Sequence, residues 1–187
     1  MIKKFFALFL GAGLAVSIIG CASTSEAATA AKKEEEPVVV ENPFVPGDFW
    51  EATEYVKSYS SDGAKLGDET KLGKITGGAN LKMVNKGAGV AGTIAENTTG
   101  YVQVSNGKAG SISFGVTPEV KKLTIAAKAV SGKAFQVKQN GNVIRKAIDC
   151  CKSDYENHVI ELNNSADALI EISGYGATCN VKAIKAE

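Results

Sequence analysis

The sequence predicts an all-β sandwich or barrel for residues 44–187. Short apolar runs alternate with polar residues and recur at intervals of about 8–12 residues, as in sandwiches and barrels. Glycine, with 20 residues in the chain, separates many of these runs. The pair Asn140-Gly141 lies between two of them, and it is a strong hairpin signal because both central residues of the favoured turn need a positive φ. The segment is long enough to form one domain with its own core.

The clearest expected strands lie in the C-terminal half. In the last run, Cys179 and Val181 share one face, whereas Ile184 and Ala186 share a face whose register has slipped by one residue. A β-bulge near residues 182–183 is therefore predicted, because one extra residue would turn all four side chains inward. The alternation predicts strands over 111–116, 122–128, 135–138, 143–148, 158–162, 168–172 and 179–186, and more weakly over 81–84, 90–94 and 101–104; residues 50–59 fit a strand or a helix.

The first twenty residues have the pattern of an export signal. Two lysines within residues 1–4 precede an apolar run over 5–19, and Gly20 and Cys21 follow. The run is too short for a membrane span, which needs about 20 apolar residues. Ile18-Ile19-Gly20-Cys21 resembles the lipobox of bacterial lipoprotein signals, although Leu and then Ala or Ser are more usual at its first two places.

This resemblance implies a signal peptide over 1–20, cleaved by the lipoprotein signal peptidase, and a lipid on Cys21 that anchors the chain to a membrane of the cell envelope. The residue after the cysteine is Ala22 rather than Asp, which favours the outer membrane in bacteria that sort lipoproteins by this position. The alternative is an ordinary secretory signal followed by an unmodified cysteine.

Residues 21–43 form the expected tether. They are small, then polar and charged, and they contain no aromatic residue. Such a segment cannot bury enough apolar surface to offset the entropy lost on ordering, so we predict a flexible spacer. The chain has 21 basic and 20 acidic residues, and removing Lys3 and Lys4 leaves 19 and 20, a net charge of −1. This balance argues against a nucleic-acid partner, because modules that bind nucleic acids are usually clearly basic.

Three segments of residues 44–187 carry a second resemblance. They are Asp48-Phe49-Trp50, the pair of runs over 111–116 and 122–128, and the terminal run over 179–187. Together they resemble the jelly-roll, carbohydrate-binding-module-like domains appended to secreted bacterial polysaccharide lyases. The chain departs from such domains at Lys182-Ala183, where they usually carry tyrosines. The resemblance implies a jelly-roll type β-sandwich that binds a polysaccharide without cleaving it.

Two motifs that could indicate an enzyme lack their required context. Residues 87–92, Gly-Ala-Gly-Val-Ala-Gly, match the dinucleotide-binding fingerprint, but residues 93–100 are too few and too β-like for the helix that must follow. A glycine-rich strand or loop is expected instead. His158 is the only histidine, and the chain has no Gly-x-Ser-x-Gly elbow to supply a nucleophile for it. We therefore predict a structural or surface histidine and no enzymatic activity.

No metal or other cofactor is expected. Asp62, Asp68 and Glu69 lie in a glycine-rich stretch and could bind calcium as loop carboxylates of a jelly roll. They lack the regular Asp-x-Asp-x-Asp-Gly order, which favours a solvated loop. No Cys-x-x-Cys spacing supports a zinc site around His158.

Tyr175 and Tyr155 are the candidate glycan-binding residues. Tyr175 lies between two glycines, and Tyr155 between Asp154 and Glu156, so both occur in turn-like or polar contexts that favour exposure. An exposed aromatic ring can stack on a sugar face, whereas Trp50, next to Phe49, is expected in the core.

The cysteines other than Cys21 are odd in number, which is unusual for an oxidising compartment. If Ile144 and Ile148 face inward, Cys150 lies on the same face, and Cys179 faces inward in its own strand. A Cys150–Cys179 disulfide with Cys151 left over is therefore predicted; a bond between the adjacent Cys150 and Cys151 is sterically awkward. Three buried thiols are the alternative.

Two hypotheses of function follow. The first is a membrane-anchored, non-catalytic lipoprotein of the cell envelope that binds extended glycans. The second is a structural or protein-interacting envelope lipoprotein that binds no glycan. Exposed aromatic side chains gathered on one face would favour the first, and a flat apolar patch without them the second.

Overall fold

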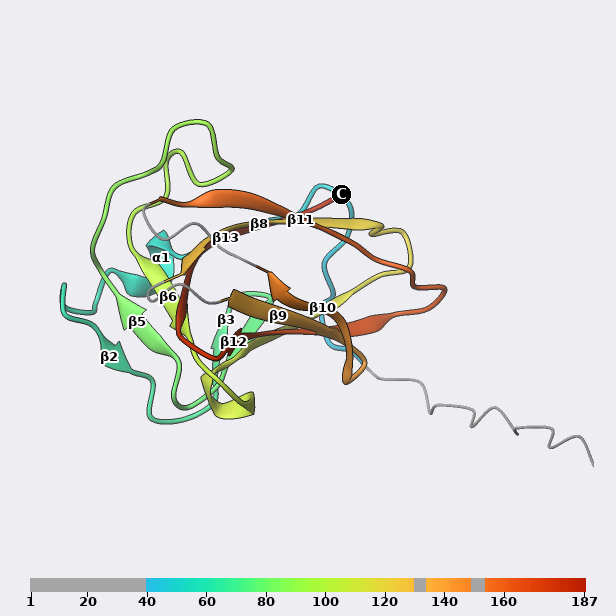
Figure 1. Cartoon of the computed structure of the whole chain (residues 1–187), viewed down its shortest axis with the longest axis horizontal. Helices are drawn as coiled ribbons and strands as arrows, with labels where there is room; N and C mark the ends of the chain where they lie inside the picture. The colour runs from blue at the N-terminus through green and yellow to red at the C-terminus, as the bar shows by residue number, and fades with distance from the viewer. Residues whose placement is uncertain (1–39, 130–133, 149–153) are drawn as a thin grey trace, which may run out of the picture. The chain divides into compact units, whose positions relative to one another are not determined.

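The protein is a β-sandwich, which confirms the predicted fold class. The computed structural model describes residues 40–129, 134–148 and 154–187. Two antiparallel sheets lie face to face (Figure 1). The expected signal peptide over residues 1–20, most of the expected tether including Cys21, and the cysteines at 150 and 151 lie outside the described residues, so the predictions made for them are not tested. Within the described part of the chain, no helix is long and apolar enough to cross a membrane.

The seven-stranded sheet has the order β11-β8-β13-β6-β5-β2, with β1 added on β13. Its strands are β1 (Phe49–Glu51), β2 (Ala64–Lys65), β5 (Lys82–Val84), β6 (Tyr101–Val104), β8 (Lys122–Ala129), β11 (Glu156–Glu161) and β13 (Cys179–Ala186).

The six-stranded sheet has the order β10-β9-β12-β7-β4-β3. Its strands are β3 (Thr70–Leu72), β4 (Ile75–Gly77), β7 (Ile112–Val116), β9 (Ala134–Gln139), β10 (Asn142–Ile148) and β12 (Ala168–Tyr175). From β7 to β13 the chain passes between the sheets five times, because only β9 and β10 are consecutive in one sheet. This crossing connectivity is of the jelly-roll type.

The predicted β-bulge in the last strand is confirmed. The register of β13 against β8 shifts between Val181 and Ala183. As a result Cys179, Val181, Ile184 and Ala186 all belong to the buried core. The bulge also sets the site described below, because the residue at the shift, Lys182, lies on the outer side of the sheet.

The Asn140-Gly141 hairpin is also confirmed. Asn140 has a φ of 49° and Gly141 a φ of 79°, and the flanking strands β9 and β10 pair antiparallel. Residues 50–59, which fitted either a strand or a helix, contain both: β1 is followed directly by the short helix α1 (Thr53–Val56). A 3-10 turn, η1 (Lys108–Gly110), precedes β7.

The expected strand over 90–94 is wrong. Residues 85–100 form a loop with successive turns, in which Val90 N donates to Ala95 O at 3.1 Å and Thr98 N donates to the same oxygen at 3.1 Å. The loop folds back over the outer side of the seven-stranded sheet, where Ala95 packs on Ala126 and Ala183. The apolar residues of the loop therefore pack in this small cluster and do not form the buried face of a strand.

The domain's first buried side chain is Phe44, which is 1% exposed. Its amide donates to Gly115 O at 2.8 Å, and its carbonyl accepts from Thr117 N at 2.9 Å. Lys74 holds the same segment, because its ammonium donates to Pro43 O at 3.0 Å and to Asp48 Oδ2 at 2.5 Å. The segment that leaves the expected tether is thus fixed to the six-stranded sheet.

Candidate functional site

A hollow of about 240 Å³ lies on the outer side of the seven-stranded sheet. Strand alternation explains its floor: Val102, Ala129 and Cys179 face the core, so the residues next to them face outward. The hollow is lined by Lys86, Gly87, Ala88, Tyr101, Lys128, Tyr155, Asn180 and Lys182.

Strand register brings the polar floor together. Asn180 of β13 lies opposite Lys128 of β8 on one side and Gln103 of β6 on the other. The Gln103 side chain donates to Asn180 Oδ1 at 3.0 Å, which fixes the amide. The phenols of Tyr101 and Tyr155 lie beside it in the hollow, and the buried phenol oxygen of Tyr155 has no hydrogen-bond partner among the described residues. Burial raises the pKa of both phenols, so they stay protonated donors at neutral pH.

Lys182 is a buried cation beside the hollow. The residue is 1% exposed, and its ammonium donates to Ala88 O and Thr98 O at 2.9 Å and to Gly100 O at 3.0 Å. Burial and, second, the nearby charge of Lys128 together lower the pKa of Lys182 to about 8. The group is still largely protonated at pH 7.

Tyr155 is covered by two cations. The ammonium groups of Lys128 and Lys182 each lie over its ring, 5.2 Å from the ring centroid. A cation at this distance is attracted by the electron-rich face of the ring. Tyr155 is thus half-buried, and two lysines cover its ring. The polar neighbours of Tyr155 in the sequence predicted a more exposed ring, so this ring is less accessible for stacking on a sugar than expected.

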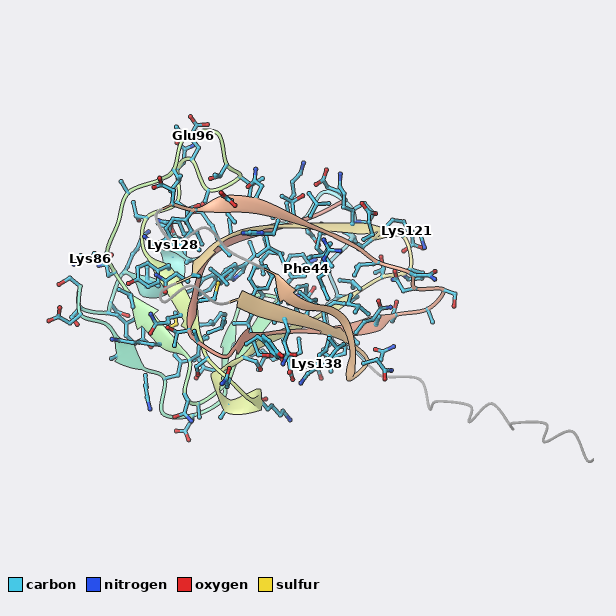
Figure 2. The ribbon with its side chains drawn as sticks, in the orientation of Figure 1. Phe44, Lys86, Glu96, Lys121, Lys128 and Lys138 are labelled. Carbon is cyan, nitrogen blue, oxygen red and sulfur yellow. The ribbon has the colours of Figure 1, made fainter. Side chains whose placement is uncertain are left out.

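The hollow is positively charged. It is lined by three lysines and no carboxylate. Within the described residues, neither Lys86 nor Lys128 has a carboxylate partner within salt-bridge distance. Figure 2 shows both lysines toward one end of the sandwich and Lys121 toward the other. Amide and phenol groups that hydrogen-bond to hydroxyls, next to ammonium groups that attract anions, can hold a hydroxyl-rich anionic ligand.

Tyr175, the other predicted glycan-binding residue, is not near this floor. It ends β12 in the opposite sheet, is half-buried, and is not among the residues that line the hollow. Its role stays a prediction. Trp50 lies in the core as predicted: it is 4% exposed, stacks on Tyr55 with ring centroids 5.9 Å apart, and donates from Nε1 to Leu72 O at 3.0 Å.

His158 points into the sandwich. Its ring meets the buried ring of Phe135 edge-on, with centroids 5.3 Å apart, and its Nε2 lies 3.3 Å from Ala127 O. These contacts agree with a structural histidine. Asp62, Asp68 and Glu69 are exposed, and among the residues that the structure describes no three His, Cys, Asp or Glu side chains gather as a metal site would require.

Cys179 is buried on the core side of β13, with its Sγ 3.2 Å from Lys128 O. The inward orientation predicted for it is confirmed. The other half of the expected bridge, Cys150, lies outside the described residues, so the Cys150–Cys179 disulfide stays a prediction.

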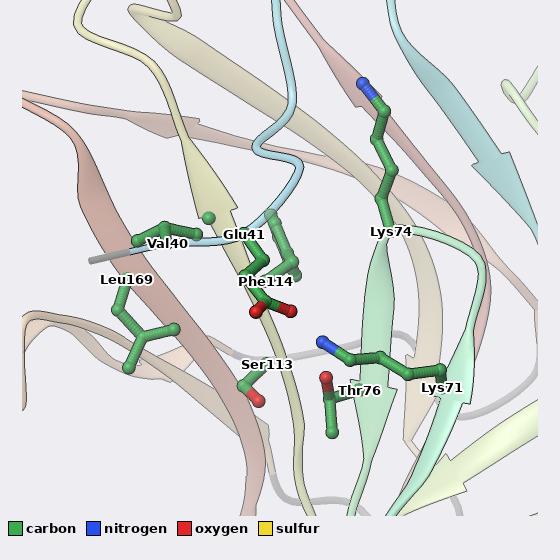
Figure 3. A pocket seen from close by; sticks show the side chains of 9 residues that line it. Val40, Glu41, Lys71, Lys74, Thr76, Ser113, Phe114 and Leu169 are labelled. Carbon is green, nitrogen blue, oxygen red and sulfur yellow. The ribbon is translucent and has the colours of Figure 1, made fainter. Parts of the chain in front are cut away.

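A second, larger hollow of about 320 Å³ lies on the outer side of the six-stranded sheet (Figure 3). Glu41 from the N-terminal segment and Lys71 from β3 point into it, and Thr76 and Ser113 form its floor. It carries both signs of charge, and residues 40–41 of the chain itself form one wall. The hollow around Tyr155 is therefore the better site for an external ligand.

Sequence reasoning missed most of this site. Tyr155 is a predicted glycan-binding residue, but Lys128, Asn180 and Lys182 are not. Each lies at an outward position of a strand, which alternation alone could have shown. Their convergence could not be seen, because it depends on the pairing of β13 with both β8 and β6.

No family model matches the chain, and no curated protein matches it. Among solved structures, a family 35 carbohydrate-binding module from Clostridium thermocellum is similar, with 13% identity and a TM-score of 0.48 over 74% of this chain and 97% of that one. A family 6 carbohydrate-binding module aligns with 7% identity and a TM-score of 0.44 over 69% and 95% of the two chains.

A third similar structure is the CBM36-1 domain of a multidomain xylanase from the hindgut metagenome of Trinervitermes trinervoides. It has 15% identity and a TM-score of 0.40 over 55% of this chain and 89% of that one. All three identities are below 25% and all three TM-scores are below 0.5. What this chain binds must therefore be inferred from its own residues.

Proposed function

We propose that this chain is a lipid-anchored, non-catalytic lipoprotein of the cell envelope whose domain binds extended glycans, with a preference for acidic ones. The observation that carries the proposal is the hollow in which Lys86, Lys128 and Lys182 surround Tyr101, Tyr155 and Asn180 without a carboxylate. Lysines attract the carboxylate or sulfate of an acidic sugar, and the amide and phenols bond its hydroxyls.

Binding at one such hollow is expected to be weak. Each sugar contact exchanges a hydrogen bond to water for one to protein, so the net gain per bond is about 0.5–1.5 kcal/mol. The lipid on Cys21, expected from the sequence, would gather many copies on one membrane. A long polysaccharide could then engage several copies at once, which raises the overall affinity without any new contact.

A glycan array tests the proposal. The unlipidated mature chain, residues 22–187, is applied to acidic polymers such as pectin and to neutral polymers, at low and at high salt. Salt-sensitive binding to acidic polymers, with no release of shorter chains, is the expected result. Binding at the level of an unrelated protein on every polymer contradicts the proposal.

The second candidate function is protein interaction. Val143 and Ile144 of β10 are 48% and 38% exposed, and β10 is the edge strand of its sheet. An exposed edge strand can pair with a strand of another protein. If the array is negative while a defined envelope protein co-purifies with the full chain and is lost on Val143→Lys, this candidate replaces the first.

Replacing Lys128 by alanine should weaken binding of an acidic glycan about tenfold, because a hydrogen bond to a charged group contributes about 1.5–3 kcal/mol. Isothermal titration measures the affinity, and the salt dependence should become shallower. Lys121→Ala is the matched control, because that lysine is at the far end of the sandwich, where its ammonium donates to Asn164 O at 2.9 Å. Equal losses in the two variants would place the ligand elsewhere.

Raising the pH from 7 to 9 should weaken acidic-glycan binding severalfold, because Lys182, with a pKa of about 8, loses its charge. Stability should respond in the opposite sense. The pKa of the folded state lies below the ordinary value of 10.5, so between these values the unfolded chain binds more protons and this group makes the folded state more stable as pH rises. Titration and thermal melts at both pH values separate the two effects. A concerted loss of binding and stability would contradict the assignment.

A further inference from the structure

The two ends of the loop over residues 85–100 meet at the ammonium of Lys182. Ala88 O lies near the start of the loop, and Thr98 O and Gly100 O lie at its end; all three accept from Lys182 Nζ at 2.9–3.0 Å. Gly87 O is a fourth oxygen at 3.4 Å. Gly100 N also donates to Gly87 O at 3.0 Å, which closes the loop at its base.

The oxygens around this ammonium outnumber its protons. A lysine ammonium has three N–H donors, and here it faces four backbone carbonyls. No carboxylate lies within salt-bridge distance of it among the described residues. A shell of backbone carbonyls is the arrangement that holds potassium ions in channel filters, where carbonyl oxygens replace the hydration shell.

The glycines of the loop allow this shell to form. Gly87 has a φ of 95° and Gly100 a φ of 69°, conformations that other residues rarely adopt. At Gly89, an added Cβ would lie 1.6 Å from Glu96 O, so only glycine permits the two arms of the loop to touch. The Gly-Ala-Gly-Val-Ala-Gly motif thus serves a tightly closed loop, as the absence of a following helix indicated.

We propose that residues 87–100 form a cation-binding cage of backbone carbonyls, which the chain fills with its own lysine ammonium. The cage accepts a small monovalent cation. In this protein the cation is the side-chain ammonium of Lys182, which is itself a residue of β13. Once filled, the cage fixes Gly87 and Ala88, which are also a wall of the hollow. Only this last step, in which Lys182 positions the wall for ligand binding, depends on the proposed glycan function.

The first test removes the N–H donors of Lys182 and keeps the volume of its side chain. Lys182→Met should lower the melting temperature by roughly 10 °C, because the carbonyls of the buried residues Thr98 and Gly100 and those of the exposed residues Gly87 and Ala88 lose their donor. It should also speed amide exchange over residues 87–100. Lys121→Met is the matched control, because the ammonium of Lys121 donates to a single carbonyl. This variant loses about one hydrogen bond, so its melting temperature should fall by only about 1–2 °C. A Lys182→Met protein as stable as the wild type overturns the proposal.

The second test empties the cage and refills it. Lys182→Ala is melted in chloride salts of ammonium, potassium and n-butylammonium, with tetramethylammonium at the same ionic strength as the control. The three small or linear cations should recover at least half of the lost midpoint, whereas tetramethylammonium, which is bulky and has no N–H, should recover none. If the variant does not fold in buffer, the refolding yield in the same salts is the readout. Failure of all three cations overturns the proposal.

These readouts are independent of glycan binding. If cations restore the melting temperature and the glycan array is negative, the cage proposal stands and the proposed glycan-binding function is rejected. If the glycan array is positive and no cation restores the melting temperature, the glycan-binding function stands and the cage proposal is rejected. If both hold, affinity for the acidic glycan should return with the same cations that restore the melting temperature.

Discussion

Replacing Phe44 by alanine should lower the free energy of unfolding by about 3–5 kcal/mol, the usual cost of deleting a buried phenylalanine ring. The ring is 1% exposed and meets the Phe114 ring at a centroid distance of 4.9 Å. Lys74 Nζ lies 5.7 Å from its centroid, so the variant also loses a cation–π contact. The space cannot collapse easily, because the Phe44 backbone is held to β7 by a parallel bridge to Val116.

Urea unfolding of the mature chain measures this loss, and Phe49→Ala is the matched control. Phe49 is 48% exposed, so its truncation should cost less than about 1 kcal/mol. The comparison also tests where folded structure begins, because Phe44 is the first residue of the predicted domain. Equal costs for the two variants would mean that the chain before β1 contributes nothing to the core, and that the boundary predicted at residue 44 is misplaced.

Local patterns predicted the elements whose side chains alternate strictly. The run over 122–128 forms β8, in which Leu123, Ile125 and Ala127 fill the face toward the core. The Asn140-Gly141 turn has the positive φ angles that its residue types favour. The bulge near Lys182 was predictable for the same reason: a slip in the apolar alternation of a buried strand has to be absorbed by an extra residue.

Tertiary contacts decided what the patterns could not show. Residues 90–94 have the composition of a strand, but their loop is closed at its base by Lys182, a residue more than eighty positions away. The contact of Ile94 N with Asn157 Oδ1, at 3.0 Å, fixes the loop's tip to a third distant segment. Local propensity carries no information on such contacts, so the loop was misassigned.

The site was only partly predictable for a related reason. Tyr155 was chosen because its sequence neighbours are polar, which favours an exposed ring. In the structure it does line the hollow, but two lysines from neighbouring strands cover its ring. Lys128 and Lys182 come beside it only through the pairing of β8 with both β11 and β13. A single sequence indicates which face a lysine occupies, but not which ring it meets.

Replacing Cys21 by serine should abolish acylation of the chain and leave an uncleaved precursor, because lipid transfer needs the cysteine thiol and the cut that follows needs the thioether formed from it. The effect should be all or none. Each buried methylene contributes about 0.8 kcal/mol to membrane binding, so a cysteine with two or three acyl chains is held stably, whereas the serine variant has no chain at all.

Mass spectrometry of the N-terminus and fractionation of membranes measure this outcome. Cys151→Ser is the matched control, because it removes a cysteine of the mature domain and should leave the lipid in place. An unlipidated N-terminus at a residue other than 21 would identify an ordinary secretory signal. The avidity argument would then fail, because unanchored copies cannot gather on a membrane, and only single-site binding at the hollow around Tyr155 would be left to account for the function.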